Sequence, residues 1–497
     1  MDAFFSVFQL NVLIPWLLAM ILGIFVGGIP GLTATMAVAL IVPLTYHMQP
    51  VAGLAMIIGV SFTSIFAGDI PATFLRVPGT PASGAAVLDG YQMNLKGQGS
   101  LAVTLDLICS CIGGFIGIMI LILIAPALSR FALKFTHFEY FWLGVLGLSM
   151  SAIISKGSRL KGAISMIIGV LISTIGIDVT TGYPRFAKGN IQLMGGIEFI
   201  PIMIGLFGIS EVFRSIYTMQ NMKVPVFNEE IKVSFKSLGK ILNRNKRLIA
   251  QSSVIGTLIG ALPGAGADIA AWVSYGLAKR TSKRPDDFGS GSEEGVIAPT
   301  SANNAAIGGT WIPALVFGIP GDTITAIVLG AMMMYGLKPG PLVFEGERFL
   351  VNQIFSVGLV SQVFLLVLGY IGIKSFSLIF KFPRNVILAG IMIFSMVGSY
   401  AIRNNIFDVG VVLVFGIVGF AMERAAMPLA PLILGRILGP MIEENLRIGL
   451  IKTSGSFAAF INRPISFSLF LILVVMFLWD PVKKIIVNTR ARAKAHK

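Results

Sequence analysis

Residues 76–90 read RVPGTPASGAAVLDG, and they interrupt one of the most apolar regions of the chain. The stretch contains an arginine, an aspartate, two prolines and three glycines. Proline removes a backbone hydrogen-bond donor and glycine lets the chain leave helical geometry, so Pro78 and Gly79 together end one helix and allow another to begin. Inside a bilayer such a break is costly unless protein or water satisfies the freed backbone groups. The cost of this break indicates that it has a structural or functional role.

The composition of the whole chain is typical of a polytopic helical membrane protein. Of its 497 residues, 55% are hydrophobic and 12% are charged, and the mean hydropathy is +0.85. Several apolar runs approach or exceed the roughly 20 residues that cross a bilayer core, among them residues 107–128, 351–373, 386–401 and 465–479. A transmembrane barrel would show short alternating strands instead. The net charge of +15 comes from Lys and Arg beside apolar runs, so we expect a lipid bilayer around the protein and no nucleic-acid partner.

The broken stretch has a second copy in the chain. VPGTPASGAAVLDGYQMNLKGQG resembles IPGDTITAIVLGAMMMYGLKPG, which places Pro78 against Pro320, 242 residues later. GGIPGLTAT likewise resembles GALPGAGAD, and LFGISEVFR resembles LGPMIEENLR. Internal repeats of this kind indicate homologous halves. We therefore predict an all-α polytopic membrane protein with a first repeat at residues 1–217, a basic linker at 218–248, a second repeat at 249–460, and an extra helix with a basic tail at 461–497.

The charge distribution predicts how the repeats are oriented. The two strongest basic blocks, residues 214–247 and the C-terminal tail, indicate the cytoplasmic side, whereas no Lys or Arg precedes the first apolar run. An odd number of crossings in each half fits this pattern, because the extra helix then returns the tail to the cytoplasm. Inverted repeats of this kind are a common plan of secondary transporters. Parallel repeats with an even number of crossings are the alternative.

Each half contains two apolar stretches that are broken by Pro-Gly, at residues 30–31 and 78–79 and again at 263–264 and 320–321. The breaks could be simple kinks, since Gly and Pro are common in membrane helices. A helix that begins after such a break, however, presents free N–H groups and the positive end of its dipole, which bind carboxylates and phosphates. We predict substrate binding by ten residues of the two broken hairpins: Arg76, Pro78, Gly79, Thr80, Ser83, Asn303, Asn304, Pro320, Gly321 and Thr323.

Several of these residues have alternative roles. Arg76 could bind a substrate carboxylate, pair with Asp69 or Asp89, or reach the membrane surface. The amides of Asn303 and Asn304 could bind substrate or cap a helix. A side chain at a break glycine would fill the space beside the free N–H groups, so we expect Gly79→Leu or Gly321→Leu to abolish uptake and leave membrane insertion intact.

Carboxylates near the breaks are candidates for holding a coupling cation or proton, because charged groups are expensive inside a membrane. We assign this role to six residues at or near the breaks: Gly31, Thr33, Asp69, Gly264, Asp268 and Asp322. Asp322 could instead cap its own helix. Asp106 begins a long apolar run, so we expect it at the membrane interface. Apart from a possible sodium ion we expect no cofactor and no metal.

Four of these stretches together resemble one transporter family. GGIPGLTAT, PGTPASGAAVLDGYQMNLKGQG, EEGVIAPTSANNAAIGG and GIPGDTITAIVLGAMMMYGLKPGPLVF are similar to the large membrane subunit of the tripartite tricarboxylate transporters, the TctA family. The resemblance covers roughly residues 15–450. At the hairpins it includes Pro78 to Pro81, Ser83 and Asp89, then Asn303, Asn304, Pro320 and Gly321. It departs from many members at Ala67-Gly68-Asp69 and at Arg76, so it does not identify citrate as the substrate.

The resemblance implies a function and partners that the residues alone do not. The chain would be the transport channel of the bacterial inner membrane, working with a small four-helix membrane subunit and a periplasmic solute-binding protein. It would import an organic carboxylate of the tricarboxylate or dicarboxylate class, driven by a sodium or proton gradient, and inverted hairpins favour an elevator movement.

Three other functions compete with a carboxylate importer. A permease of an ATP-driven importer is the main alternative, although the chain has no G-x-x-x-x-G-K-[ST] phosphate loop. An enzyme is disfavoured, because HExxH and GxSxG are missing from the sequence. A passive channel would need a selectivity filter, which oligomers usually build.

Overall fold

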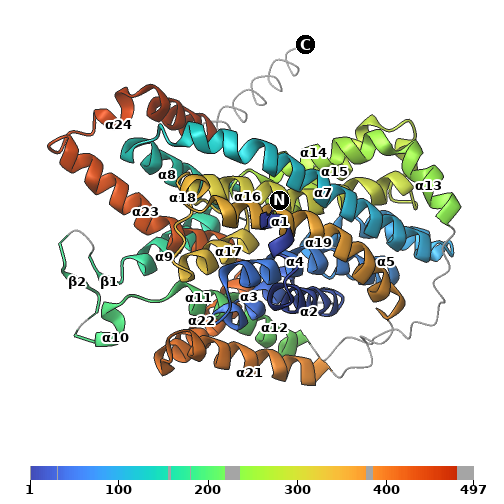
Figure 1. Ribbon diagram of the computed structural model, residues 1–497, viewed down its shortest axis with the longest axis horizontal. Coiled ribbons are helices and arrows are strands. Elements are labelled where there is room, and N and C mark those ends of the chain that lie inside the picture. The colour runs from blue at the N-terminus through green and yellow to red at the C-terminus, as the bar shows by residue number, and fades with distance from the viewer. Residues whose placement is uncertain are drawn as a thin grey trace, which may run out of the picture.

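The computed structural model describes residues 2–30, 32–154, 158–178, 181–187, 189–218, 235–376 and 384–477. Nearly all regular elements of these segments are helices (Figure 1). The described strands, β1 (Gly176–Ile177) and β2 (Pro184–Arg185), pair antiparallel in one short ribbon. The prediction of an all-α fold is therefore confirmed.

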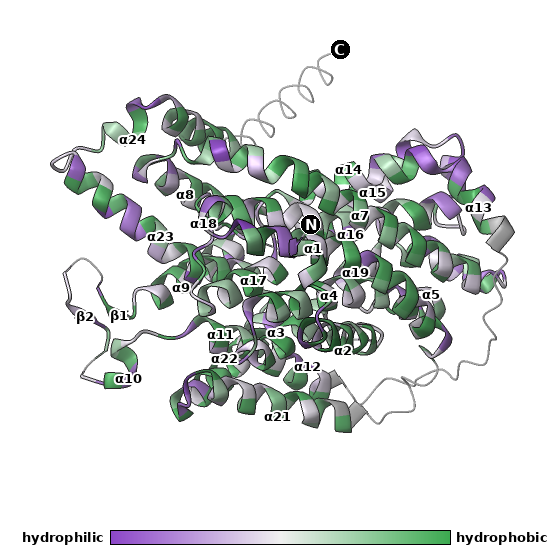
Figure 2. Cartoon of the chain, in the orientation of Figure 1, coloured by the Kyte–Doolittle hydropathy of each residue, from purple (hydrophilic) through white to green (hydrophobic). Residues whose placement is uncertain are grey.

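Six described helical segments are long and apolar enough to cross a membrane. They are Leu10–Gly27, Pro50–Leu75, Gly99–Ala132, Phe199–Tyr217, Arg348–Lys374 and Ile406–Arg424. Shorter apolar helices lie at Ala34–Thr45, Thr323–Met334, Leu388–Arg403 and Pro464–Phe477. Hydrophobic residues cover most of the helices, and hydrophilic ones gather on α13 and around α24 (Figure 2). These lengths and this composition confirm a multi-pass membrane protein.

The first half of the chain contains both broken hairpin regions predicted for it. Its helices are α1 (Asp2–Ser6), α2 (Leu10–Gly27), α3 (Ala34–Thr45), α4 (Pro50–Ala67), α5 (Asp69–Leu75), the 3-10 turn η1 (Pro81–Gly84), α6 (Val87–Leu95), α7 (Gly99–Ala132), α8 (His137–Ile154), α9 (Arg159–Ser173), α10 (Ile191–Met194), α11 (Phe199–Met203), the π-helical turn η2 (Ile204–Ile209) and α12 (Ser210–Thr218).

The second half follows the same order. Its helices are α13 (Phe235–Arg244), α14 (Lys246–Gly260), α15 (Gly266–Thr281), the 3-10 turn η4 (Pro285–Asp287), α16 (Glu293–Phe317), α17 (Thr323–Met334), α18 (Val343–Gly346), α19 (Arg348–Lys374), α21 (Arg384–Arg403), α22 (Ile406–Arg424), α23 (Ala430–Lys452), α24 (Ala459–Asn462) and a last helix at Pro464–Phe477. Part of the predicted linker, residues 219–234, and the tail after residue 477 lie outside the described residues.

Glycine contacts recur at matching positions of the two halves. A Cβ atom on Gly27 of α2 would lie 2.3 Å from the carbonyl oxygen of Ser64 on α4. A Cβ atom on Gly260 of α14 would lie 2.3 Å from the carbonyl oxygen of Ala306 on α16. Small residues let membrane helices approach this closely. The α2–α4 and α14–α16 crossings therefore use the same backbone contact, in agreement with the internal repeat.

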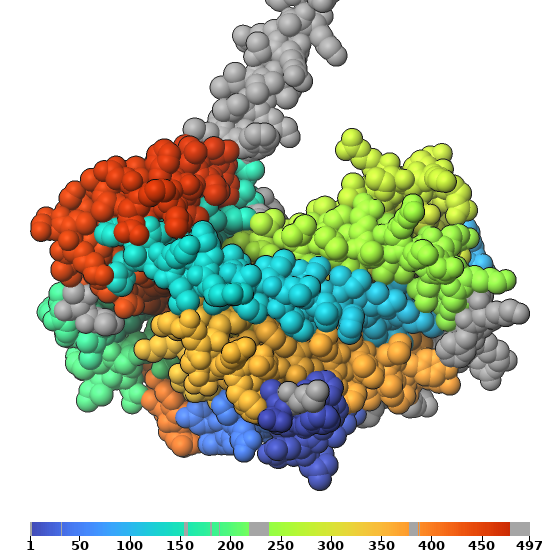
Figure 3. All heavy atoms as spheres, turned by 45° about the horizontal axis from the view of Figure 1, so that its top comes forward, coloured from blue at the N-terminus to red at the C-terminus, as the bar shows by residue number. Residues whose placement is uncertain are grey.

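The two halves interlock through reciprocal contacts. Helix α7 packs along α16 of the other half, and its counterpart α19 packs along α4. In the same way α3 packs on α17, and η1 packs on α15. Figure 3 shows the cyan band of α7 crossing the molecule beside the orange band of α19, and these two helices are also in contact. Such an exchange is what an approximate two-fold relation produces, whereas the inverted orientation of the halves in the bilayer stays a prediction.

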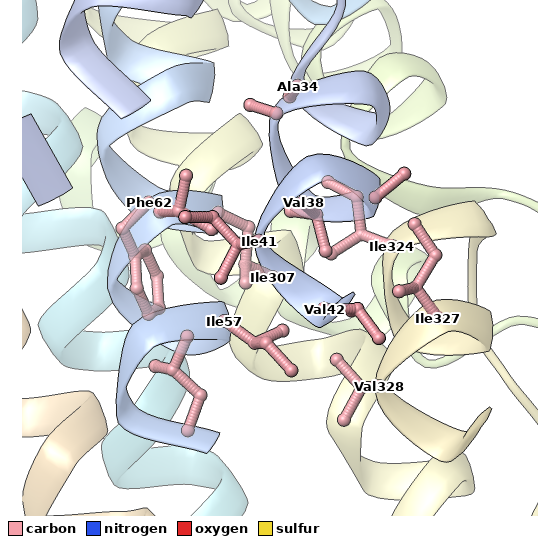
Figure 4. Packing of buried hydrophobic residues seen from close by; sticks show 14 of the residues in the cluster. Ala34, Val38, Ile41, Val42, Ile57, Phe62, Ile307, Ile324, Ile327 and Val328 are labelled. Atoms are coloured by element: carbon pink, nitrogen blue, oxygen red, sulfur yellow. The ribbon is translucent and has the colours of Figure 1, made fainter. Parts of the chain in front are cut away.

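The interior beside the breaks is filled by aliphatic side chains. Figure 4 shows α3 between α4 and α17, with Val38, Ile41 and Val42 directed at Ile57 on one side and Ile327 on the other. All five side chains are at most 3% exposed. Since α3 and α17 belong to different halves, this packing fixes the first break of one half beside the second break of the other.

Candidate functional site

The four Pro-Gly breaks converge on one cavity. Its volume is about 290 Å³, and each break contributes to its wall. The lining residues from the breaks are Thr33, Ala34, Thr35, Thr80, Pro81, Ala82, Gly264, Ala265, Gly266, Ala267, Asp268, Asp322, Thr323 and Ile324. Four segments that are far apart in the sequence thus surround one space inside an apolar protein, which isolated kinks would not do.

The starts of α3 and α17 meet at this cavity. Oγ1 of Thr35 and Oγ1 of Thr323 are 3.0 Å apart and share a hydrogen bond. Thr33 caps α3, because its Oγ1 accepts a hydrogen bond from the Met36 N–H. Asp322 caps α17 by accepting a hydrogen bond from the Thr325 N–H at 2.8 Å, and the Thr325 hydroxyl returns to the Asp322 N–H. The alternative role considered for Asp322, a helix cap, is therefore seen in the structure.

The third break is joined to the fourth by backbone contacts. The N–H of Gly264 donates to the carbonyl oxygen of Gly321 at 2.8 Å. Gly266 has a φ of +57°. A Cβ atom added at this residue would lie 2.8 Å from the Asp322 Cβ. Left-handed backbone and this close approach both require glycine. Gly31 of the first break lies outside the described residues.

The second break differs from the expectation of a free N–H cradle. The Gly79 N–H donates to the carbonyl oxygen of Gly68 at 3.0 Å, so it is occupied. A Cβ atom at Gly79 would lie 2.6 Å from both the Gly27 carbonyl oxygen and the Gly68 Cα. At Gly321 a Cβ atom would lie 2.6 Å from the Gly260 carbonyl oxygen and 2.7 Å from the Thr310 Cα. These glycines are needed because backbones meet there.

The opposite wall of the cavity comes from outer helices of the bundle. Phe207 in the π-helical turn η2 and Ser210, Glu211 and Arg214 of α12 line it, as does Glu423 of α22. π-helical turns often occur at functional sites. Arg214 and Glu211 form an ion pair at 2.5 Å. Arg214, the first residue of the basic block at 214–247, lies on α12 beside the cavity, and the cytoplasmic position of that block stays a prediction.

A second cavity of about 740 Å³ adjoins the first and shares Arg214, Asp268, Thr323 and Glu423 with it. Arg424, which stacks on Tyr217 with 4.8 Å between the guanidinium carbon and the ring centre, also lines it. The sequence offered few clues to these helix residues, because their side of the cavity contains no break. The similarity of LFGISEVFR to LGPMIEENLR, which aligns Glu211 with Glu443, identified this segment as part of the repeat but indicated no role for it.

Asp69 and Asn303 lie behind the second break, and neither they nor Asn304 line the described cavities. The Asn303 Nδ2 donates to Asp69 Oδ2 at 3.3 Å. Thr80, which lines the cavity, is 2.8 Å from Ser83 between the two hydroxyl oxygens, and Ser83 lies beside Asp69. Asp106 is 1% exposed and lies beside Asp69, so its side chain is inside the protein, and its expected place at the depth of the membrane interface stays a prediction.

The structure does not bring Arg76, Pro78 or Pro320 to the described cavities. Arg76 is exposed, adopts a left-handed conformation with φ of 59°, and stacks on Tyr91 at 5.5 Å. Asp89 is buried and structural: its Oδ1 accepts hydrogen bonds from the N–H groups of Gly289, Gly291 and Ser292, and its Oδ2 accepts one from the Tyr275 hydroxyl.

Comparisons with known proteins agree with this architecture. The family model described as the tripartite tricarboxylate transporter TctA family matches residues 13–434, which is most of the chain. The chain belongs to the TctA family. This confirms the resemblance seen in the broken hairpins and places the protein in a family of transporters, as the large membrane subunit.

Two curated relatives come from Agrobacterium vitis. This TctA-family chain is 35% identical over 450 residues, 90% of its length and 89% of the relative's, to the "Uncharacterized 52.8 kDa protein in TAR-I ttuC' 3'region". It is 38% identical over 214 residues, 43% of its length and 88% of the relative's, to the "Uncharacterized protein in TAR-II ttuC' 3'region". No solved structure matches the chain.

Proposed function

We propose that this TctA-family subunit binds an organic carboxylate, of the tricarboxylate or dicarboxylate class, in the cavity between the four Pro-Gly breaks. The observation that carries this proposal is the convergence of the breaks, and in particular the 3.0 Å contact between Thr35 and Thr323. Helices α3, α15 and α17 begin at this cavity. The positive ends of helix dipoles favour an anion at such a place.

The cavity offers suitable donors for carboxylate oxygens. Thr33, Thr35, Thr80 and Thr323 bring hydroxyl groups from three of the breaks, and Arg214 approaches from the opposite wall. Hydroxyls are small donors, whereas a guanidinium group can bind a carboxylate with two parallel hydrogen bonds. Donors on opposing walls fit a substrate that has carboxylates at more than one end.

The charge of the cavity supports coupling to a cation. Among the described residues that line it, four side chains are acidic, those of Glu211, Asp268, Asp322 and Glu423, and one is basic, that of Arg214. A carboxylate that entered alone would add negative charge to this set, which costs free energy where the surroundings are poorly hydrated. Import together with sodium ions or protons removes this cost, so a cation gradient is the driving force that we propose.

The arrangement also supports an elevator movement in the bacterial inner membrane. The hairpin elements α3, η1, α15 and α17 form one wall of the cavity, and η2, α12, α22 and α23 form the other. Sliding of one group along the other would expose the same cavity to either side, as in other repeat-built transporters. A periplasmic solute-binding protein would deliver the substrate, and a small four-helix membrane subunit would complete the complex.

The test is uptake by proteoliposomes that contain the chain with both partners. We expect saturable uptake of a labelled carboxylate only under a sodium or proton gradient. Thr323→Val or Thr35→Val should raise the KM about 2- to 10-fold, the usual effect of one lost hydrogen bond. Thr174→Val, which changes an exposed hydroxyl far from the breaks in sequence, is the matched control. Uptake that follows ATP rather than the gradient would establish the alternative, an ATP-driven permease.

A further inference from the structure

A pair of buried carboxylates lies behind the second break. Asp69, the first residue of α5, is fully buried, and Asp106 on α7 is 1% exposed. The two side chains lie against each other, and no Lys or Arg of the described segments is among the groups that act on either. Charged groups that are buried in proteins are paired or coordinate metal ions. This pair therefore calls for a positive partner.

Several oxygen atoms of the pair and of the neighbouring Asn303 accept no hydrogen bond in the described structure. Among the described residues, Asp69 Oδ1, Asp106 Oδ2 and Asn303 Oδ1 have no hydrogen-bond partner, although all three side chains are buried. The Asn303 Nδ2 donates to Asp69, which keeps the Asn303 side chain beside the pair. Buried polar atoms without partners are rare in folded proteins. Three of them in one place indicate a missing ligand that accepts electron pairs.

We propose that Asp69, Asp106 and Asn303 bind a sodium ion between α5, α7 and α16. A proton shared between Asp69 and Asp106 could satisfy both carboxylates, but it would leave the neutral amide oxygen of Asn303 without a partner. A hard cation takes carboxylate and amide oxygens together. Sodium sites in membrane transporters also occur beside broken helices, and α5, which begins at Asp69, leads into the second break.

The site is linked to the cavity through two hydroxyls. Ser83 lies beside Asp69, and its oxygen is 2.8 Å from that of Thr80, which lines the cavity. An ion that orders Asp69 would thus order the tip of the first hairpin, residues 80–83. Sodium would bind first and shape the wall that the carboxylate contacts. This role of the ion rests on the proposed function, whereas its binding does not.

The cluster breaks the symmetry of the repeats. At the offset of 242 residues that relates Pro78 to Pro320, the counterpart of Asp69 is Trp311 and the counterpart of Asn303 is Ser61. Neither replacement carries a charge, so the second hairpin has no matching acidic pair. We therefore expect one such ion site in the molecule, with both carboxylates from the first half and the amide from the second.

The first test measures binding of radiolabelled sodium to the purified full chain, and its thermal midpoint in sodium chloride against choline chloride at equal ionic strength. Wild-type protein should bind sodium and gain stability from it. Asp69→Asn and Asn303→Ser should each weaken binding about 10-fold or more, as loss of groups around a metal does. Serine is chosen for the second variant because Ser61 is the repeat counterpart of Asn303. Glu139→Gln, which changes a buried carboxylate paired with Arg463, should keep the wild-type response.

Three results would overturn the proposal: no sodium binding by the wild type, an unchanged response in both variants, or stabilisation by protons alone. A second measurement separates this proposal from the proposed function. If Asp69→Asn and Asn303→Ser proteoliposomes keep full sodium-driven uptake, the role of this ion in transport is wrong and the transporter function stands. If sodium binds as described and no carboxylate is taken up by the complex, the site stands and the proposed function is wrong.

Discussion

Replacing the glycine at either hairpin break with alanine should destabilise the protein through a backbone clash. In Gly79→Ala the new Cβ atom meets a carbonyl oxygen and an α-carbon, both at 2.6 Å. In Gly321→Ala the corresponding distances are 2.6 Å and 2.7 Å. A side chain could rotate away from such a contact, but backbone atoms of packed helices move only together.

The magnitude follows from these contacts. Overpacking of a well-packed interior costs about 1–3 kcal/mol, and two backbone contacts below 3.0 Å at each site place the cost near the upper end. Because the two glycines occupy matching positions of the repeat, we expect equal losses of about 2–3 kcal/mol in the free energy of unfolding.

The assay is unfolding of the purified chain in mixed micelles, followed by tryptophan fluorescence. Gly276→Ala is the matched control, because this glycine lies within α15 and a Cβ atom there would meet nothing within 4 Å. Alanine in an open helical position should stabilise by about 0.5–1 kcal/mol. If Gly79→Ala and Gly276→Ala shift the free energy of unfolding equally, the argument from backbone contact is refuted.

Three further predictions concern groups outside the cavity. Asp89→Asn should cost about 1.5–3 kcal/mol, because the hydrogen bonds of a charged group to the 289–292 loop are lost, and faster proteolysis of that loop would show it; an unchanged loop would contradict the structural role. Arg76→Gly should leave the unfolding free energy equal or raise it by up to about 1 kcal/mol, since its counterpart Gly318 has the same left-handed conformation; a loss of stability would mean that the side chain itself holds the fold. Glu443→Gln should remove ion pairs to Arg185 and Arg447, costing about 1 kcal/mol at low salt and less at high salt; a cost independent of salt in thermal melts would exclude an electrostatic origin.

Much of the fold could be predicted from the sequence because it depends on local signals. Length and hydropathy identify membrane helices, and Pro-Gly pairs mark where they break, so the segments around Pro78 and Pro320 were predicted correctly as interruptions between helices. The repeat also gave pairs of positions, such as Gly27 and Gly260, that make the same contact in the structure. The free N–H group expected at Gly79 is not seen, since this N–H donates to the Gly68 carbonyl oxygen.

The opposite wall and the interior could not be predicted because they depend on tertiary contacts. Arg214 belongs by sequence to a basic block, and its position beside Glu423 follows only from the packing of α12 on α22. A single carboxylate near the start of an apolar run, such as Asp106, is compatible with a membrane surface. Asp106 is buried because α7 packs against α16, which belongs to the other half of the chain, and the sequence does not show this contact.

The hydrogen bonds of Asp89 have a consequence for the moving parts of the transporter. They run from α6 in the first half to α15 and the loop that precedes α16 in the second, and four donors meet one buried carboxylate. A cycle that pulled the two sequence halves apart would have to break all four and leave that charge without partners. In the elevator movement that we propose, we therefore expect the two hairpins, although encoded more than two hundred residues apart, to move as a single body.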